Sequence, residues 1–324
     1  MLGATEGTTQ GKGARATLVI GTRGSKLALA QTEIVRMCLL DVHPDLDVRI
    51  ETISTKGDVV QDRPLSQIGG NGVFVRQIER ALLEGTVDVA VHSAKDLPSL
   101  LSPGLTIAAY MTREDPRDVL VSRDGSTLTG LSTGARVGTS SPRRACQLSA
   151  LRPDLTLLDI RGNVDTRLRK LREGQYDAIV LAAAGLSRLG LLHEVSEWLE
   201  PAVILPAVAQ GALAVEVREG DTAAQDLVTP LNDPATSTAV RSERAFLRGV
   251  GGSCALPIGA YGIVRGDRLI LAGMIGSAHG GMVRGAIEGA VSEGQELGAS
   301  LAERLLSEGG AAFLEEDAVV ERPS

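Results

Sequence analysis

The chain has 324 residues and a mass of 33.8 kDa, more than one hydrophobic core usually serves, so two or three domains are expected. Hydrophobic residues make up 43%, which argues against a disordered chain. One tryptophan, three tyrosines and three phenylalanines are too few for the stacking surfaces of a single-strand nucleic-acid binder, and a net charge of −7 argues against nucleic acid or an anionic membrane as a partner.

The cysteines and the apolar runs bear on the cellular compartment. Cys38, Cys146 and Cys254 are odd in number and far apart, so neither a disulfide framework nor a metal site is expected. The first residues do not resemble a signal peptide, and no apolar run approaches the roughly 20 residues that a membrane span needs. We therefore expect a cytoplasmic protein without a membrane segment, and a monomer, because nothing in the sequence indicates an oligomer.

Strands and helices alternate in the first third of the chain. Residues 1–16 lack periodicity and are expected to form a mobile tail. Ser25 is typical of a helix cap after a strand and a glycine turn. The apolar pattern predicts strands at 18–20, 48–54, 87–92 and 107–111, and helices at 26–40 and 73–83.

A polar stretch at 112–117, which contains Pro116, indicates a crossing into a second domain. The alternation then resumes, and Ser141 before Pro142 is typical of a helix start. Strands are predicted at 136–138, 155–160 and 177–183, and helices at 142–151, 164–172 and 184–189. Such alternation is typical of parallel sheets covered by helices.

The pattern changes after about residue 235. It predicts a helix at 236–248, two strands at 258–264 and 269–275, and a final amphipathic helix at 296–306. A hairpin with helices indicates a small α+β domain. The expected fold class is therefore α/β, with two such domains followed by this smaller one.

The basic residues are mostly arginines, because only five of the 33 are lysines and 28 remain. A compositional bias explains this excess as well as a need to bind planar anions does. Several arginines follow predicted strands or begin predicted helices, where ligands of open α/β sheets bind and where acidic side chains are usually favoured. They are Arg23, Arg143, Arg144, Arg161, Arg167 and Arg188. Against the alternative of solvated surface arginines, their placement indicates a polyanionic ligand between two domains.

Three further positions are candidates for chemistry. Asp96 ends the polar cluster after the strand at 87–92, where a carboxylate could hold a pyrrole-like N–H or a developing cation, or could simply cap a turn. Cys254 lies in a glycine-flanked loop that an electrophile could approach, although an inert thiol is the commoner case for a lone cysteine. The loop Gly69-Gly-Asn-Gly72 lacks a phosphate-loop ending, so a lid or a structural turn is expected.

The chain resembles the porphobilinogen deaminase family, also called hydroxymethylbilane synthase, from about Thr17 to beyond Ala260. The shared segments are Ile20-Gly-Thr-Arg-Gly-Ser-Lys-Leu-Ala-Leu29, Val91-His-Ser-Ala-Lys-Asp-Leu-Pro98, Gly138-Thr-Ser-Ser-Pro-Arg-Arg144, Ile160-Arg-Gly-Asn-Val-Asp-Thr-Arg-Leu168, Leu181-Ala-Ala-Ala-Gly-Leu-Ser-Arg-Leu-Gly190, Leu205-Pro-Ala-Val-Ala-Gln-Gly211, Ser242-Glu-Arg-Ala-Phe246 and Gly252-Ser-Cys-Ala-Leu-Pro-Ile-Gly259.

The resemblance implies an enzyme that joins four porphobilinogen units with loss of ammonia and releases linear hydroxymethylbilane. It implies a dipyrromethane cofactor joined to Cys254 by a thioether, and Asp96 as the group that contacts pyrrole nitrogens and stabilises the cationic intermediate. The pyrrole carboxylates would be partners for the arginines. Cofactor contacts are implied for Ser93, Lys95, Asp96, Thr139, Ser141, Arg143, Arg144 and Arg188, and substrate contacts for Arg23, Arg161, Arg167 and Gln210.

The family architecture implies two α/β domains like those of periplasmic binding proteins, separated by a cleft, and a C-terminal domain that carries the cysteine. The implied boundaries are 17–112 with 212–232, then 116–206, then 235–316. Where many relatives carry lysines in the lid, this chain has Gln67 and Asn71, and Ser253 replaces a glycine beside the cysteine. Ala30 stands where tryptophan is common.

A non-catalytic solute-binding protein or the effector domain of a regulator would share the two-domain cleft and the arginines. Such a protein would not require Cys254 or Asp96. The lack of a signal peptide and of a DNA-binding segment also argues against it.

Overall fold

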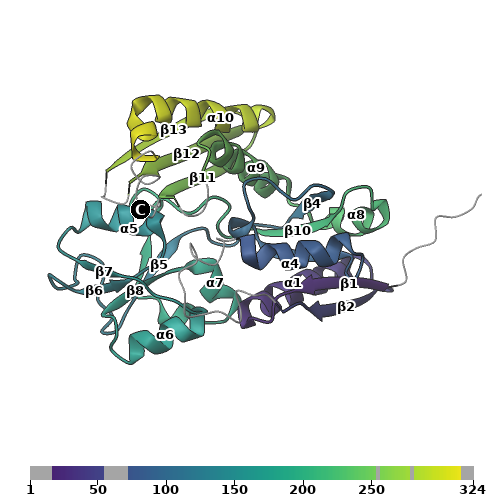
Figure 1. Ribbon diagram of the computed structural model, residues 1–324, viewed down its shortest axis with the longest axis horizontal. Helices are drawn as coiled ribbons and strands as arrows, with labels where there is room; N and C mark the ends of the chain where they lie inside the picture. The colour runs from purple at the N-terminus through teal and green to yellow at the C-terminus, as the bar shows by residue number, and fades with distance from the viewer. Residues whose placement is uncertain (1–16, 55–71, 253–255, 278–280, 315–324) are drawn as a thin grey trace, which may run out of the picture.

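In the computed structural model, the described residues are 17–54, 72–252, 256–277 and 281–314. Three sheets organise them, two built alike and one smaller (Figure 1). The first sheet has the strand order β2-β1-β3-β10-β4. Its strands are β1 (Thr17–Thr22), β2 (Asp47–Thr52), β3 (Val89–Ser93), β4 (Leu105–Tyr110) and β10 (Leu213–Arg218).

Helices cover both faces of the first sheet. They are α1 (Lys26–Val42), α4 (Gly72–Leu83) and α8 (Thr222–Val228). Val35 of α1 and Val228 of α8 share one core with Leu18 and Val215 of the strands. Ile78 of α4 belongs to a separate core on the other face. The inner strands of the sheet are therefore buried on both sides, as their apolar sequences predict, whereas the edge strand β2 is largely exposed.

The second sheet repeats this plan with the order β7-β6-β8-β5-β9. Its strands are β5 (Asp118–Ser122), β6 (Arg136–Gly138), β7 (Thr156–Leu158), β8 (Ala178–Ala182) and β9 (Glu197–Leu199). Its helices are α5 (Pro142–Leu151), α6 (Val164–Arg172) and α7 (Ala183–Arg188). Leu148 of α5 packs in one core, whereas Leu171 of α6 and Leu186 of α7 pack in another, so α5 lies opposite the other two helices.

Both large sheets are mixed, so the expectation of wholly parallel sheets is wrong. β1, β2 and β3 are parallel, as are β6, β7 and β8. β10 is antiparallel to β3 and β4, and β5 is antiparallel to β8 and β9. β5 and β10 are the strands that follow the two crossings between the sheets, at 111–117 and 200–212. Because the chain arrives from the neighbouring unit, β5 and β10 each run opposite to the parallel strands of the sheet that they join.

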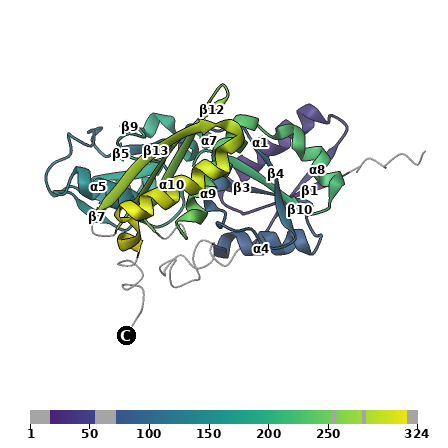
Figure 2. The same cartoon turned by 90° about the horizontal axis from the view of Figure 1, so that it is seen from above.

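The third sheet is antiparallel, in the order β11-β12-β13, and it lies above the other two units in Figure 1. Its elements are β11 (Ile258–Arg265), β12 (Arg268–Gly276), β13 (Met282–Ala290), α9 (Pro234–Gly249) and α10 (Gly294–Leu305). Seen from above in Figure 2, α10 crosses this sheet. The helices approach closely, because a Cβ at Gly298 would meet the carbonyl oxygen of Ser242 at 2.3 Å.

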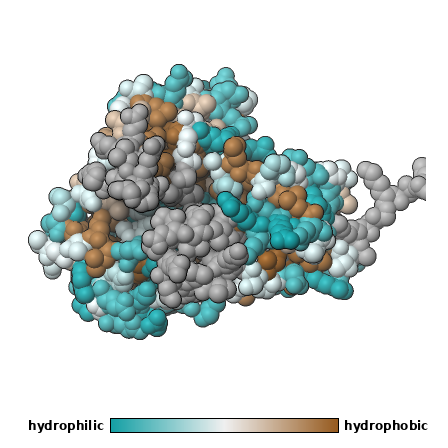
Figure 3. Space-filling view, viewed as in Figure 1, coloured by the Kyte–Doolittle hydropathy of each residue, from teal (hydrophilic) through white to brown (hydrophobic). Residues whose placement is uncertain are grey.

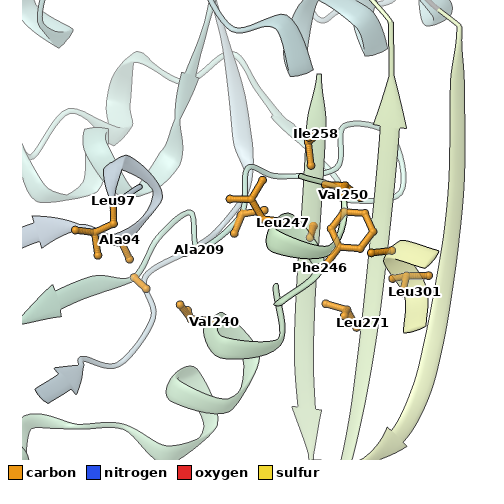
Figure 4. Packing of buried hydrophobic residues seen from close by; sticks show 14 of the residues in the cluster. Ala94, Leu97, Ala209, Val240, Phe246, Leu247, Val250, Ile258, Leu271 and Leu301 are labelled. Atoms are coloured by element: carbon orange, nitrogen blue, oxygen red, sulfur yellow. The ribbon is translucent and has the colours of Figure 1, made fainter. Parts of the chain in front are cut away.

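One hydrophobic core joins this unit to the first sheet. Phe246 of α9 is fully buried and packs in a cluster with Leu271 of β12 and Leu301 of α10 (Figure 4). Ala94 and Leu97, which follow β3, belong to the same cluster. A single core therefore fixes the segment after β3 relative to helix α9.

The α/β class with a small α+β unit, expected from the sequence, is confirmed, whereas the residue boundaries of the three domains stay a prediction. None of the described helices is long and apolar enough to cross a membrane. On the face drawn in Figure 3, hydrophobic residues lie in separate groups among hydrophilic ones.

Candidate functional site

Asp96 lies where three cavities meet. The cavities measure about 250, 240 and 70 Å³, and Asp96 lines all of them. The aspartate ends a single turn of 3-10 helix, Ala94–Asp96, that directly follows β3. Its side chain is exposed, whereas Ala94 and Leu97 on either side are buried in the core of Figure 4. The backbone is thus held from beneath while the carboxylate faces open space.

The cavity of 240 Å³ lies between the two large sheets, beyond the carboxyl ends of their parallel strands. Arg23 follows β1, Ser93 ends β3 and Ala182 ends β8, and all three line it. Ser93 exchanges hydrogen bonds with Gln31 of α1: Gln31 Nε2 donates to Ser93 Oγ at 2.8 Å, and Ser93 Oγ donates to Gln31 Oε1 at 3.2 Å. This is the edge where open α/β sheets bind their ligands.

Basic side chains dominate the walls of both larger cavities. Among the described residues that line it, the 240 Å³ cavity has five basic residues against one acidic residue, Asp96. The basic residues are Arg23, Lys95, Arg144, Arg167 and Arg188. In the 250 Å³ cavity, Asp96 is again the one acid among the lining residues, against Lys95, Arg143, Arg144, Arg167 and Arg244. Both cavities therefore suit a ligand with several negative charges.

A buried aspartate holds two of these arginines. Asp118, the first residue of β5, is fully buried, and its two carboxylate oxygens lie 2.8 Å from Arg143 Nη2 and 2.7 Å from Arg144 Nη2. The arginines also donate to the carbonyl oxygens of Leu205, at 2.6 Å, and Val180, at 2.8 Å. Burial alone would raise the pKa of Asp118, but the two guanidinium groups hold it well below its usual value. The chain itself thus supplies an anion for the start of α5.

Gln210 links this ion pair to Lys95. Its Nε2 donates to Asp118 Oδ1 at 2.8 Å and to the carbonyl oxygen of Pro116 at 2.8 Å, and its Oε1 accepts from Lys95 Nζ at 3.1 Å. Burial lowers the pKa of Lys95 to about 8; Arg144 and Arg143 add to this effect, while Asp96 and Asp118 oppose it. An added negative charge near Lys95 would therefore stabilise its protonated form.

Burial also lowers the pKa of two arginines that line the 240 Å³ cavity. Burial, together with the neighbouring Arg144 and Arg161, lowers the pKa of Arg167 to about 10. Burial lowers the pKa of Arg188 to about 10, opposed by Glu114. Both remain charged near neutrality. Because a bound carboxylate would compensate this loss of hydration, the two positions favour an anionic ligand.

The structure brings most of the predicted site residues together. The three cavities are lined by Arg23, Ser93, Lys95, Asp96, Ser141, Arg143, Arg144, Arg167, Arg188 and Gln210. Two predicted residues do not line them. Thr139 is buried, and its Oγ1 accepts from the backbone N–H of Ser141 at 3.2 Å, which shapes the start of α5. Arg161 Nε lies 3.5 Å from Asp159 Oδ2.

The predicted cofactor cysteine, Cys254, lies outside the described residues, as do Ser253, Gln67 and Asn71. The chain on both sides of the cysteine is described. Leu247 of α9 precedes it, and Leu256 and Ile258 follow it, and all three line the 250 Å³ cavity with Asp96.

Sequence reasoning missed Asp118, Gln31 and Arg244. Arg244 of α9 lines the 250 Å³ cavity and donates from Nη2 to the carbonyl oxygens of Pro98, at 2.6 Å, and Ser99, at 3.3 Å. A charged residue directly before the apolar run Val119–Val121 was the available signal for Asp118. Across the described ranges, no group of three or more potential ligands could hold a metal ion.

Comparisons with known proteins show similarity over most of the chain. A family model described as "Porphobilinogen deaminase, dipyromethane cofactor binding domain" matches residues 18–226, and one described as "Porphobilinogen deaminase, C-terminal domain" matches residues 237–307. A porphobilinogen deaminase of Roseiflexus castenholzii is 59% identical over 300 residues, which cover 93% of this chain and 99% of that relative. A porphobilinogen deaminase of Syntrophotalea carbinolica is 48% identical over 293 residues, covering 90% and 93% respectively. Among solved structures, the VFT2 domain of Bordetella pertussis BvgS matches 66% of this chain and 84% of its own, at 15% identity and a TM-score of 0.40.

Proposed function

Because the chain belongs to the porphobilinogen deaminase family, we propose that it is a transferase that joins four porphobilinogen units head to tail. Each condensation releases ammonia, and water finally releases the linear hydroxymethylbilane. The family is one of enzymes, and its first domain model is that of the dipyrromethane cofactor. When bound, that cofactor supplies the pyrrole carbon to which the first unit is added.

The observation that carries this proposal is the charge of the cavities around Asp96. Porphobilinogen and its oligomers carry two carboxylates on each pyrrole, and five basic residues face one acid in the 240 Å³ cavity. Guanidinium groups bind carboxylates through two parallel hydrogen bonds, so such a wall neutralises a growing polyanion. We assign this work to Arg23, Arg144, Arg167 and Arg188, with Lys95 between the cavities.

We assign the central chemical role to Asp96. Loss of ammonia from the aminomethyl group leaves positive charge on the pyrrole, and a carboxylate beside the ring stabilises that charge where it develops. Asp96 suits this role because, among the described residues, it is the one acidic group that lines both larger cavities. A carboxylate oxygen also accepts the pyrrole N–H, which fixes the ring in place.

We assign the covalent attachment of the cofactor to Cys254. Leu256 and Ile258, two and four residues further along the chain, line the cavity that also contains Asp96 and Lys95. The core of Figure 4 ties helix α9, which leads to the cysteine, to the turn that carries Asp96. A cofactor attached between them would lie among Ser141, Arg143 and Arg144 at the start of α5.

The direct experiment is turnover of porphobilinogen by Asp96→Asn. We expect a loss of at least about a hundredfold in kcat, with the cofactor still attached, because Asn keeps the shape and removes the charge. Asp165→Asn is the matched control: this aspartate lies on α6 at 3.5 Å from Lys26 Nζ and is half exposed, outside the three cavities. Near-normal turnover of Asp96→Asn, or an equal loss in the control, would remove Asp96 from the mechanism.

A monomeric state and a cytoplasmic location stay predictions from the sequence. Light scattering on the purified protein measures the first, and localisation of a tagged chain in its own cell measures the second.

A further inference from the structure

A groove of about 450 Å³ lies outside the cavities that meet at Asp96. It is bounded by helix α9 on one side and by β4 with the segment before it, residues 99–103, on the other. β4 is an edge strand of the first sheet, and α9 lies beside it in Figure 1. We call this space the outer groove. It shares only Arg244 with the 250 Å³ cavity.

Three arginines from one face of α9 enter the outer groove. Arg241, Arg244 and Arg248 are three and four residues apart, so they lie in a row about 10 Å long. Glu219 is the one carboxylate among the lining residues. Arg241 and Arg248 are exposed, and neither forms an ion pair within the described part of the chain; Arg248 Nη2 donates to Gln295 Oε1 at 3.4 Å. The described residues that line the groove therefore carry a net positive charge.

The opposite wall of the outer groove presents several apolar side chains among Ser99, Ser102 and Thr106. Leu100 is 72% exposed there, the highest exposure among the large hydrophobic side chains of the described residues. Leu101 and Ile107 are partly buried and rest on the core that includes Phe246. Tyr110 is buried beneath them, and burial raises the pKa of its hydroxyl, opposed by the three arginines. The hydroxyl is therefore a neutral hydrogen-bond donor at physiological pH.

We propose that the outer groove binds a small organic anion that carries two or more carboxylates on an apolar ring. The row of guanidinium groups matches spaced carboxylates, and the leucine wall matches the ring that bears them. An inorganic anion would use the arginines and leave Leu100 exposed to water. Arg241 and Arg248 line none of the three cavities that meet at Asp96, so we expect turnover not to depend on these two residues.

The test is calorimetric titration of the purified holoprotein with trimesate, a benzene ring with three carboxylates, and separately with inorganic phosphate. The double variant Arg241→Gln/Arg248→Gln removes the two exposed charges of the groove. The double variant Arg268→Gln/Arg304→Gln is the matched control, because these half-exposed arginines of the same unit pair with Glu288 and Glu308. Both variants have the same net charge.

We expect saturable binding of one trimesate per chain, weakened at least about tenfold in the groove variant and unchanged in the control. Phosphate should bind at least about tenfold more weakly than trimesate, and the groove variant should turn over porphobilinogen normally. Three results would each overturn the proposal. The first is that trimesate does not bind saturably, or that it binds the groove variant as tightly as the natural chain. The second is that the control variant weakens binding as much as the groove variant does. The third is that phosphate binds as tightly as trimesate.

Discussion

Replacement of Asp118 by Asn tests how the arginine pair at the start of α5 is held. Asp118 is fully buried and faces Arg143 at 2.8 Å, Arg144 at 2.7 Å and Gln210 at 2.8 Å. Asn keeps one acceptor oxygen, which can serve Arg144 and Gln210 together, but its amide group then faces Arg143. Two buried guanidinium groups, 4% and 6% exposed, would remain without a counter-charge from the chain.

Removing one partner from a buried ion pair typically costs about 3–5 kcal/mol. We expect the free energy of unfolding of the second sheet to fall by that amount in Asp118→Asn. Trp198 is the one tryptophan of the chain and lies on β9, paired with Val119 of β5, so its fluorescence in urea reports on this region. Because the folded pKa of Asp118 lies below its unfolded value, its contribution is complete above about pH 4 and is lost only at lower pH.

Asp177→Asn is the matched control for this measurement. Asp177 also faces two arginines, Arg136 at 3.0 Å and Arg123 at 3.5 Å, but it is 29% exposed. Ion pairs in contact with water contribute about 0–1 kcal/mol, so we expect a smaller loss there. If Asp118→Asn lost no more stability than Asp177→Asn between pH 5 and 8, the buried counter-charge would not be what holds the arginine pair.

Two further predictions concern the cationic walls. Since the pKa of Lys95 is about 8 when folded and 10.5 in the reference state, we expect kcat/KM for porphobilinogen to fall above about pH 8, and Lys95→Arg to flatten that fall. Because the folded chain loses this proton at a lower pH than the unfolded chain, the contribution of Lys95 to the free energy of unfolding rises between about pH 8 and pH 10.5. Identical pH profiles of kcat/KM for the natural chain and Lys95→Arg would show that Lys95 does not cause the fall. Arg143→Leu, Arg144→Leu and Arg161→Leu should impair cofactor assembly or chain growth, measured by mass and turnover, and normal values in all three would defeat that role. Only the first two should also lose stability, because Arg161 has no buried ion pair with Asp118.

Helices and strands with clear local signals could be predicted closely from the sequence. Ser25 caps α1 by accepting from the N–H of Ala28 at 3.2 Å, and Ser141 with Pro142 starts α5, as expected. Four strands, β5, β9, β10 and β13, were missed. In β13, Gly285 and Gly289 interrupt the apolar pattern and one face is exposed. Its place in the sheet comes from pairing with β12, which local sequence does not encode.

Ten of the residues predicted for the site line the three cavities, but the pairings between their side chains could not be predicted from the sequence. The sequence indicates that the arginines at the start of α5 need an anion, and a bound ligand is the anion that it suggests. The structure supplies Asp118, which is 25 residues before Arg143 and reaches it through a strand that follows the crossing between sheets. Similarly, the substrate contact of Gln210 stays a prediction, and its three hydrogen bonds, which join Lys95 to Asp118 and Pro116, could not be predicted. Such long-range contacts depend on topology, which periodicity does not reveal.

The most direct test of the account is the intact mass of the purified protein beside that of Cys254→Ser. We predict that the natural chain is heavier than its sequence by one covalently attached dipyrromethane, and that the variant has the mass of the bare polypeptide. A natural chain of unmodified mass that is inert toward porphobilinogen, or a variant that keeps the added mass, would contradict it.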